Sequence, residues 1–149
     1  SNHLPHARSL RDLSPEKIKP FKTELGSPVF ERCEYVTEEN DRVLKSCEAM
    51  EKGDFRKLGE MMFGSHEGLS LKYNVSCPEL DLLVKTAKSL PGVLGSRMMG
   101  GGFGGCTINL VENSAMEDVK TALDHSYLKQ FGKSPVFYNV CISDGAGEI

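Results

Sequence analysis

The sequence has 149 residues, of which 39% are hydrophobic and 26% are charged, and its net charge is −3. This length suits one domain with its own core and is too short for two domains of typical size. The slightly acidic balance argues against a nucleic-acid-binding surface, and the lack of a long apolar run argues against a membrane span.

The chain begins with Ser-Asn rather than methionine, a start typical of a proteolytic scar, so we expect the sequence to be a piece of a longer protein. Its cysteines are odd in number, lie far apart and include no C-x-x-C pair. This pattern predicts reduced, mostly buried thiols of a cytoplasmic protein and no metal site. The five cysteines are Cys33, Cys47, Cys77, Cys106 and Cys141.

Prolines punctuate residues 1–35, which we expect to form a connecting arm. Ser14 followed by Pro15 predicts one short helix in this arm, because serine favours the N-cap and proline the first helical position. The apolar residues of the arm are expected to need a partner outside the sequence. Residues 36–149 are expected to form one domain.

Two helices joined by a tight turn are predicted after the arm. Thr37 suits the N-cap of the first helix, Gly53 its end, and Asp54 the N-cap of the second. Apolar residues recur at helical spacing in both and are expected to pack in the core, where methionine readily fills gaps. These residues are Val43, Leu44, Cys47, Met50, Phe55, Leu58, Met61 and Met62.

A third helix is predicted to begin at Pro78. Glu79 and Asp81 fall in its first turn, where the positive end of the helix dipole alone explains two acidic residues. Pro91 and Gly92 are expected to stop this helix.

Three strands and a further helix are predicted in the last third of the chain. Residues 93–98 and 106–111 have a strand-like pattern, and 136–142 is β-branched and aromatic. Between them, Ser114 suits the N-cap of a helix that Gly132 closes. Strands joined by a short loop pair antiparallel, so the predicted fold class is α+β, with a ferredoxin-like antiparallel sheet packed with helices.

The strongest signal is the loop between the first two predicted strands, where five of the six residues from 100 to 105 are glycine. Glycine costs entropy to order, so such a run indicates unusual backbone angles or a close approach to the backbone. Gly100, Gly102 and Gly105 fit the pattern G-x-G-x-x-G. However, a strand follows instead of the helix of a dinucleotide fold, and the Lys-Ser/Thr pair of a P-loop is missing.

Two interpretations of this loop remain open. It is either a purely structural hairpin or a concavity whose backbone N–H groups bind an anion, with Arg97 adding positive charge. The density of glycine favours the second interpretation. The residues that would line the concavity are Gly100, Gly101, Gly102, Phe103, Gly104 and Gly105.

Other chemically active side chains favour structural roles. His66, with Ser65 and Glu67 beside it, is more typical of a hydrogen-bonded packing residue than of a catalytic base. Cys106, at a strand start, is more typical of an inert core residue than of a reactive thiol. No acid–base pair, nucleophile–base pair or metal cluster can be assembled, so we predict no catalytic residue and no metal ligand in this sequence.

Several motifs resemble those of a known family. "GSRMMGGGFGGCTINLV", residues 95–111, resembles the third signature of the galactokinases, which belong to the GHMP small-molecule kinases. "SHEGLSLKYNVSCPELDLLV" resembles the galactokinase segment upstream of it, and "GDFRKLGEMM" and the final "ISDGAGEI" also fit. The likeness runs from about Val36 to the C-terminus. Met99 departs from it, because many galactokinases have threonine there.

This resemblance implies a GHMP-kinase C-terminal domain over residues 36–149. It implies an enzyme that transfers the γ-phosphate of ATP to the anomeric hydroxyl of D-galactose in the cytoplasm. ATP and Mg²⁺ would be bound mainly by a separate N-terminal part that also holds the catalytic residues, so the fragment alone is expected to be inactive. Gly100–Gly105 would lie near the sugar and the transferred phosphoryl group, with Ser96 and Arg97 as supporting residues.

Two other hypotheses remain. The first is a galactokinase-like sugar sensor that binds ligands and a regulatory protein without catalysis. The second is an interaction domain whose glycine hairpin is structural. An intact phosphate loop with a catalytic Asp and Arg in the N-terminal part would favour the enzyme.

Overall fold

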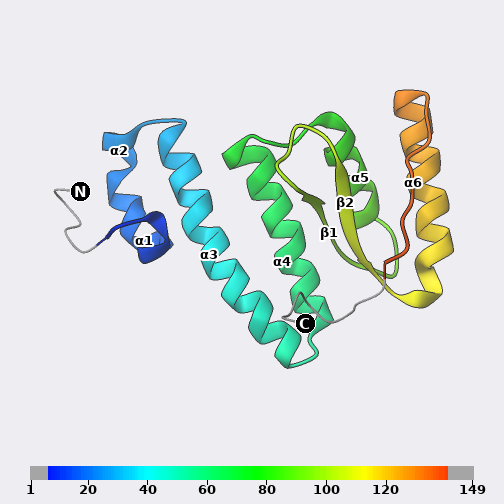
Figure 1. Cartoon of the computed structure of the whole chain (residues 1–149), viewed down its shortest axis with the longest axis horizontal. Helices are drawn as coiled ribbons and strands as arrows, with labels where there is room; N and C mark the ends of the chain where they lie inside the picture. Colours follow the sequence, from blue (N-terminus) through cyan, green and yellow to red (C-terminus); the bar gives the residue numbers. More distant parts are fainter. Residues whose placement is uncertain (1–6, 141–149) are drawn as a thin grey trace, which may run out of the picture.

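In the computed structural model, which describes residues 7–140, helices pack around a two-stranded antiparallel sheet (Figure 1). This arrangement confirms the predicted α+β class. In chain order, with η marking short 3₁₀ or π-helical turns, the elements are η1 (Leu10–Asp12), α1 (Pro15–Ile18), η2 (Lys19–Phe21), α2 (Lys22–Leu25), α3 (Val29–Glu51), α4 (Phe55–Gly68), η3 (Leu69–Tyr73), α5 (Pro78–Lys88), β1 (Val93–Met99), β2 (Cys106–Val111), η4 (Asn113–Ala115) and α6 (Met116–Phe131).

The N-terminal arm packs on the first half of α3, at the opposite end of the molecule from α6 (Figure 1). Its first α-helix begins at Pro15, as predicted. Ile18 is buried, and α1 contacts α3. The expectation that the apolar residues of the arm lack a partner is therefore wrong for Ile18, because α3 reaches far enough toward the N-terminus to cover it.

The first long helix starts earlier than predicted. α3 begins at Val29, so the expectation that Thr37 caps it is wrong. Thr37 is buried inside the helix, and its hydroxyl donates a hydrogen bond to the carbonyl oxygen of Glu34 at 2.8 Å. Phe30 and Tyr35, which precede Thr37 in the helix, are buried, and their packing stabilises the additional turns at the N-terminal end of α3. The division at residue 35 falls within α3 and stays a prediction.

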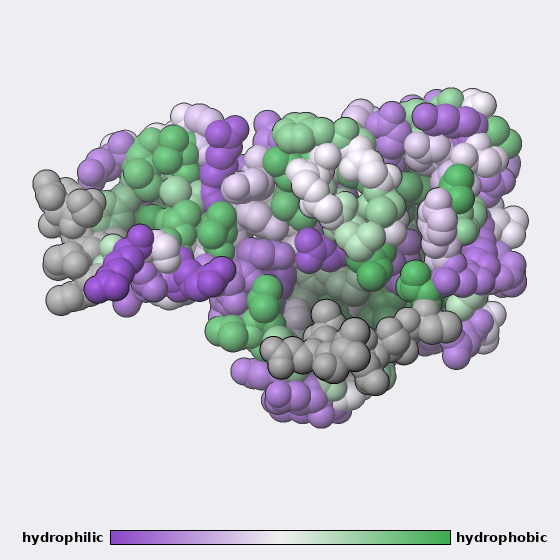
Figure 2. Space-filling model, viewed as in Figure 1, coloured by the Kyte–Doolittle hydropathy of each residue, from purple (hydrophilic) through white to green (hydrophobic). Residues whose placement is uncertain are grey.

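The predicted core face of α3 is wrong. Val43, Leu44 and Met50 are 55%, 65% and 52% exposed, and Cys47 is also exposed, whereas the same helix buries Ala49. Helical spacing gives the width of an apolar face but not the side on which the neighbouring elements lie. Apolar residues accordingly reach the surface among polar ones on the face shown in Figure 2.

The second predicted helix is α4, and its predicted cap is confirmed. The Asp54 carboxylate accepts a hydrogen bond from the backbone N–H of Lys57 at 3.0 Å. Of the predicted core residues, Leu58, Met61 and Met62 are half-buried, whereas Phe55 is 51% exposed.

The core lies where α5 and α6 pack together beside the sheet. α5 begins at Pro78, as predicted. Its buried residues meet those of α6, and partly buried residues of both strands pack against them. The buried members of this cluster are Ala87, Val119 and Leu123, and Leu80, Val84 and Met98 are buried elsewhere along the same elements.

α4 approaches β1 very closely. A Cβ atom built on Gly59 of α4 would lie 1.8 Å from the carbonyl oxygen of Leu94, and one on Gly95 would lie 2.5 Å from the Cα of Gly59. Only glycine permits this backbone contact. The contact holds β1, and therefore the loop that follows it, against α4.

The sheet consists of β1 and β2, paired from Val93 with Val111 to Met99 with Cys106, with an irregularity after Val93. The predicted strand over 136–142 is wrong for residues 136–140, which have no regular structure, while residues 141–142 lie outside the described range. Most apolar side chains of 136–140 are exposed, and β-propensity without a buried face does not hold a strand.

The last helix confirms one predicted boundary and corrects the other. Gly132 closes α6 in the left-handed region, with φ of 70°, as predicted. Ser114 is not its N-cap, because Ser114 belongs to η4 and α6 begins after Ala115. Within residues 7–140, no helix combines the length and the hydrophobicity that a membrane crossing needs.

Candidate functional site

The glycine loop is an exposed hairpin whose backbone depends on glycine. It joins β1 to β2 just beyond the pair Met99 and Cys106. At Gly102 the requirement is strict, because φ is +92° and a Cβ atom would lie 2.2 Å from the carbonyl oxygen of Val75. Phe103 also has a positive φ of 58°, which is uncommon for a bulky residue.

The loop is anchored to one neighbouring segment and open elsewhere. The N–H of Phe103 donates to the carbonyl oxygen of Val75 at 2.7 Å, while the Phe103 side chain is 77% exposed. A Cβ atom on Gly100, Gly101 or Gly104 would meet nothing within 4 Å. The loop is therefore not buried in the fold, and part of its backbone is accessible to another molecule or domain.

Two hollows formed by described residues lie away from the loop. One, of about 260 Å³, lies where the turn before β1 meets the start of α6. The other, of about 300 Å³, lies between α3 and α4 and is lined mainly by charged side chains. Neither hollow is therefore a candidate for the anion-binding concavity predicted at the loop.

Ser96 lies inside the sheet, away from the loop. It is fully buried, and its hydroxyl donates to the Asn109 side-chain oxygen at 2.6 Å, directly across the strand pair. Asn109 in turn donates to the hydroxyl of Thr107. Ser96 therefore fixes the register of the hairpin.

Arg97 points toward α3. One of its guanidinium nitrogens lies 3.7 Å from a carboxylate oxygen of Glu39, and its Nε donates to the Met98 carbonyl oxygen at 3.1 Å. Glu39 also accepts hydrogen bonds from Arg42 and Ser65. The charge of Arg97 is thus tied to α3 rather than aimed at the loop.

Tyr35 belongs to the same polar cluster between α3 and α4. Burial and the nearby Glu39 carboxylate raise the pKa of Tyr35 to about 12, against the opposite effect of its hydrogen bond with Ser65. Its ring fills the space beside Gly68, where a Cβ atom would lie 2.4 Å from it. The phenol stays protonated at neutral pH and serves packing.

His66 supports β1 from α4. Its Nδ1 accepts a hydrogen bond from the N–H of Met98 at 3.2 Å, and its Nε2 lies 3.2 Å from a carboxylate oxygen of Asp81. These contacts require a neutral ring with its proton on Nε2. Burial lowers the pKa of His66, while the Asp81 carboxylate opposes this shift. The prediction of a hydrogen-bonded packing residue is confirmed.

Asp81 does more than the helix dipole explains. Besides His66, its carboxylate accepts hydrogen bonds from the hydroxyls of Ser76 at 2.6 Å and Ser70 at 3.1 Å. All four side chains come from the segment "SHEGLSLKYNVSCPELD". The only indication in the sequence was that polar residues recur along this segment. Which of their side chains meet depends on the turn between α4 and α5.

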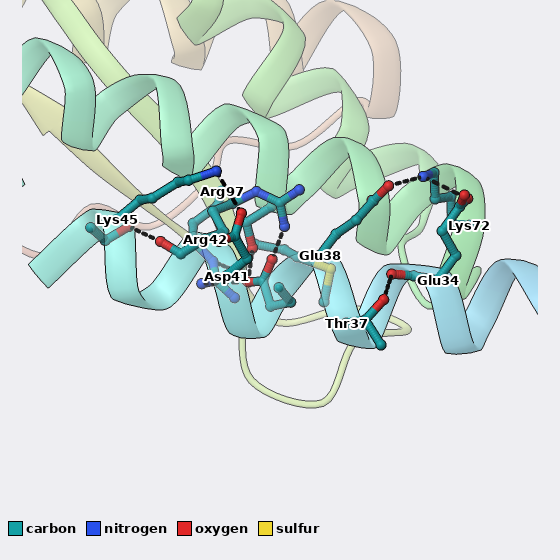
Figure 3. Close-up of polar contacts among 12 residues, drawn as sticks. Glu34, Thr37, Glu38, Asp41, Arg42, Lys45, Lys72 and Arg97 are labelled. Carbon is teal, nitrogen blue, oxygen red and sulfur yellow. Dashed lines mark hydrogen bonds and ion pairs between the residues drawn. The ribbon is translucent and has the colours of Figure 1, made fainter. Parts of the chain in front are cut away.

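That turn is itself fastened to α3. The Lys72 ammonium contacts the carboxylates of Glu34 and Glu38 at 2.9 and 2.7 Å (Figure 3). Because Lys72 lies in η3, shortly before Val75, these ion pairs hold the segment that anchors the glycine loop.

The cysteines differ from expectation. Cys106, predicted to be a core residue, is exposed beside the loop, because its side chain lies on the open end of the hairpin. Cys47 is exposed, and Cys33 and Cys77 are half-buried; Cys141 lies outside the described residues. The expectation of mostly buried thiols is wrong for these four. In the described part of the chain no group of three or more His, Cys, Asp or Glu residues could hold a metal.

Comparison with known proteins places the chain in a family. The family model described as "GHMP kinases C terminal" matches residues 30–130. The galactokinase of Roseiflexus sp. (strain RS-1) is 41% identical over 145 residues, which are 97% of this chain and 37% of that protein. The galactokinase of Bos taurus is 41% identical over 138 residues, covering 93% of this chain and 34% of that protein.

A solved structure is similar as well. The crystal structure of Lactococcus lactis galactokinase complexed with galactose matches with a TM-score of 0.85 and 34% identity, over 89% of this chain and 34% of that chain. The chain therefore spans less than two-fifths of the length of the relatives that it matches.

Proposed function

Because this chain belongs to the C-terminal domain family of the GHMP kinases, we propose that it is the C-terminal part of a galactokinase. The longer protein would transfer the γ-phosphate of ATP to D-galactose in the cytoplasm. The observation that carries this proposal is the exposed glycine loop, which is anchored by its hydrogen bond to Val75 and lies in the segment that resembles the third galactokinase signature.

In the proposed reaction, the anomeric oxygen of galactose forms a bond to the γ-phosphorus of ATP. The bond between that phosphorus and the β–γ bridging oxygen breaks, and ADP leaves with the electron pair. The hydroxyl proton passes to a base outside this chain. The products are galactose 1-phosphate, ADP and a proton. Such transfers depend mainly on positioning and on stabilising charge.

The loop suits the second of these tasks. Backbone N–H groups that no side chain shields can approach a charged phosphoryl oxygen closely, and fixed N–H dipoles need no reorganisation when charge develops. The open space beside Gly100, Gly101 and Gly104 supports this role. Ser96 and Arg97 would act as supporting residues: Ser96 holds the strand register, and Arg97 ties β1 to α3.

Magnesium would bind outside this chain. Mg²⁺ requires oxygen ligands, usually carboxylates, together with substrate phosphates, and residues 7–140 offer no cluster of such ligands. When bound, it would neutralise charge on the phosphates. As the resemblance to galactokinases implies, we propose that its ligands, and most ATP contacts, lie in a separate N-terminal part of the longer protein.

The test is an assay of the full-length protein with D-galactose, ATP and Mg²⁺, following galactose 1-phosphate by mass spectrometry and ADP by a coupled enzyme. We expect both products in equal amounts, and no turnover by this chain alone. Galactose binding by the full-length protein without ADP release would favour the sugar-sensor hypothesis instead. Turnover by the isolated chain would contradict the division of labour proposed above.

A further inference from the structure

The glycine loop is fastened to the rest of the molecule at two points, one on each side of Gly100. Before the loop, the N–H of Met98 donates to Nδ1 of His66 at 3.2 Å. Within the loop, the N–H of Phe103 donates to the carbonyl oxygen of Val75 at 2.7 Å. The positions of His66 and Val75 therefore contribute to where the loop lies.

The first anchor depends on Asp81. An imidazole ring can rotate about its side-chain bonds, so a single hydrogen bond at Nδ1 does not fix its orientation. The Asp81 carboxylate lies 3.2 Å from Nε2 on the other side of the ring and holds both the orientation and the tautomer that Met98 needs.

The second anchor depends on the same carboxylate. Ser76, next to Val75, donates to one oxygen of Asp81 at 2.6 Å, and Ser70 donates to the other at 3.1 Å. The N–H of Val75 itself bonds the carbonyl oxygen of Leu69, next to Ser70. Asp81 thus holds both sides of the turn that carries the Val75 carbonyl.

We propose that Asp81 is a positioning residue for the glycine loop, because one carboxylate fixes both of its anchors. Its effect on catalysis rests on the galactokinase function proposed above, but its effect on the loop does not. Removal of the carboxylate frees the His66 ring and loosens the Val75 turn, which then keeps only its backbone contacts and the Lys72 ion pairs to α3. The backbone N–H groups of the loop therefore lose their fixed direction.

The test uses the full-length protein and four variants, with hydrogen exchange measured by mass spectrometry on overlapping peptides. In Asp81→Ala we expect exchange at Met98 and Phe103 to rise by about tenfold or more through local opening, while exchange in α6 stays unchanged. Glu79→Ala is the matched control, because it removes an acidic residue from the same first turn of α5. Exchange in that variant should stay at the wild-type rate.

In Asp81→Asn, the amides of Met98 and Phe103 should keep most of the protection from exchange that they lose in Asp81→Ala. The asparagine side-chain oxygen can still accept from His66 and Ser76, and its amide group can donate to the Ser70 hydroxyl. Ser76→Ala removes only the second anchor, so it should speed exchange at Phe103 more than at Met98. It also provides a milder variant if Asp81→Ala does not fold.

Steady-state kinetics distinguish misplacement of the loop from a general loss of stability. We expect Asp81→Ala to lower kcat by about ten- to a hundredfold through misplacement of the loop, with little change in the KM for galactose. A full-length protein without kinase activity would contradict the proposed function but would leave the exchange test intact.

Three results would overturn the proposal. The first is unchanged exchange at Met98 and Phe103 in Asp81→Ala. The second is an equal rise in the exchange rate in Glu79→Ala, which would mean that the effect comes from the helix dipole rather than from the contacts of Asp81. The third is Asp81→Asn behaving like Asp81→Ala, which would mean that charge matters and the hydrogen-bond geometry does not.

Discussion

The contact between α4 and β1 and the loop after β1 are both rich in glycine, but the missing side chain serves opposite purposes in the two regions. At the contact, a Cβ atom on Gly59 would lie 1.8 Å from the carbonyl oxygen of Leu94. In the loop, a Cβ atom on Gly101 would meet nothing within 4 Å. The first glycine is required by what already touches it, whereas the second leaves space that residues 7–140 do not fill.

The two regions are joined by β1. Gly95 lies in the contact and the loop begins at Gly100, at the end of the same strand. A strand held this tightly cannot shift along α4 without backbone clashes, so the contact sets the starting position of the loop. Packing glycines therefore place the loop, and the anchors on His66 and Val75 complete its position. The predictions below test this distinction in order of decreasing effect on the free energy of unfolding.

The largest loss is expected for Gly59→Ala. The added Cβ atom would overlap a backbone oxygen, which cannot rotate away, so α4 and β1 must separate at a cost of about 3 kcal/mol. Urea unfolding of wild-type and variant chains measures this difference.

Gly64→Ala is the matched control for that substitution. It lies in the same helix, but its Cβ atom would lie 3.2 Å from the end of the flexible Arg42 side chain. Because alanine favours a helix interior, its unfolding free energy should stay within about 1 kcal/mol of the wild-type value. Equal losses in the two variants would mean that the α4–β1 contact has no special role.

A smaller loss is expected for Gly102→Ala in the loop. The substitution places a side chain at a φ of +92° and 2.2 Å from the Val75 carbonyl oxygen, so we expect a loss of about 2 kcal/mol. Because the loop is exposed, it can move away from Val75, and this limits the loss below that of Gly59→Ala. Thermal unfolding measures it. A loss equal to that of Gly59→Ala would show that the loop is packed as rigidly as the core.

The support of β1 by His66 should depend on pH. Burial lowers the pKa of His66 in the folded chain, with Asp81 opposing and Arg97 adding to this effect. In the unfolded chain the pKa is about 6.5. Below pH 6.5, His66 binds a proton more readily in the unfolded state than in the folded state. The free energy of unfolding is therefore highest above pH 6.5 and decreases as the pH falls.

His66→Asn should weaken this pH dependence, because asparagine can accept the Met98 hydrogen bond but does not titrate. His125→Asn, at an exposed position of α6, is the control and should leave the pH dependence unchanged. Urea midpoints between pH 5 and pH 8 would measure both. Identical profiles for wild type and His66→Asn would contradict the role assigned to burial.

Local signals in the sequence were enough to predict much of the fold. Asp54 before α4, Pro78 at the start of α5 and Gly132 after α6 each act within one helical turn, and all three predictions are confirmed. The start of α3 was missed because Thr37 is also a good cap, and only the burial of Phe30 shows that the helix continues past it. Burial depends on tertiary packing, which local propensity does not contain.

The same limit applies to the site. The glycine loop could be located from composition alone, since five glycines in six residues have few structural uses. The partners of Arg97 and Asp81 could not, because Glu39 lies on a distant helix and the serines around Asp81 converge only through the turn after α4. The spacing of residues in the sequence predicts which helix or strand holds each of them. The side chains that they contact depend on how these elements pack.

Of these substitutions, Gly101→Ala should have the smallest effect on the free energy of unfolding but should still lower the activity of the full-length protein. Gly101 is the loop glycine whose φ is not positive, and its Cβ atom would meet nothing within 4 Å, so the unfolding free energy should stay within about 0.5 kcal/mol. If the open backbone faces substrate in the full-length protein, as the proposed function requires, the methyl group enters that space. We expect the kcat/KM for galactose phosphorylation to fall by about tenfold or more, which corresponds to about 1.4 kcal/mol of lost transition-state stabilisation.

This substitution separates the two uses of glycine most sharply, because it adds the same methyl group as Gly59→Ala and should leave the fold intact. Unchanged stability with reduced kcat/KM would mean that the space beside Gly101 belongs to the substrate. Unchanged stability with unchanged kcat/KM would mean that the space is open to solvent even in the full-length protein, and the loop would then be a structural hairpin.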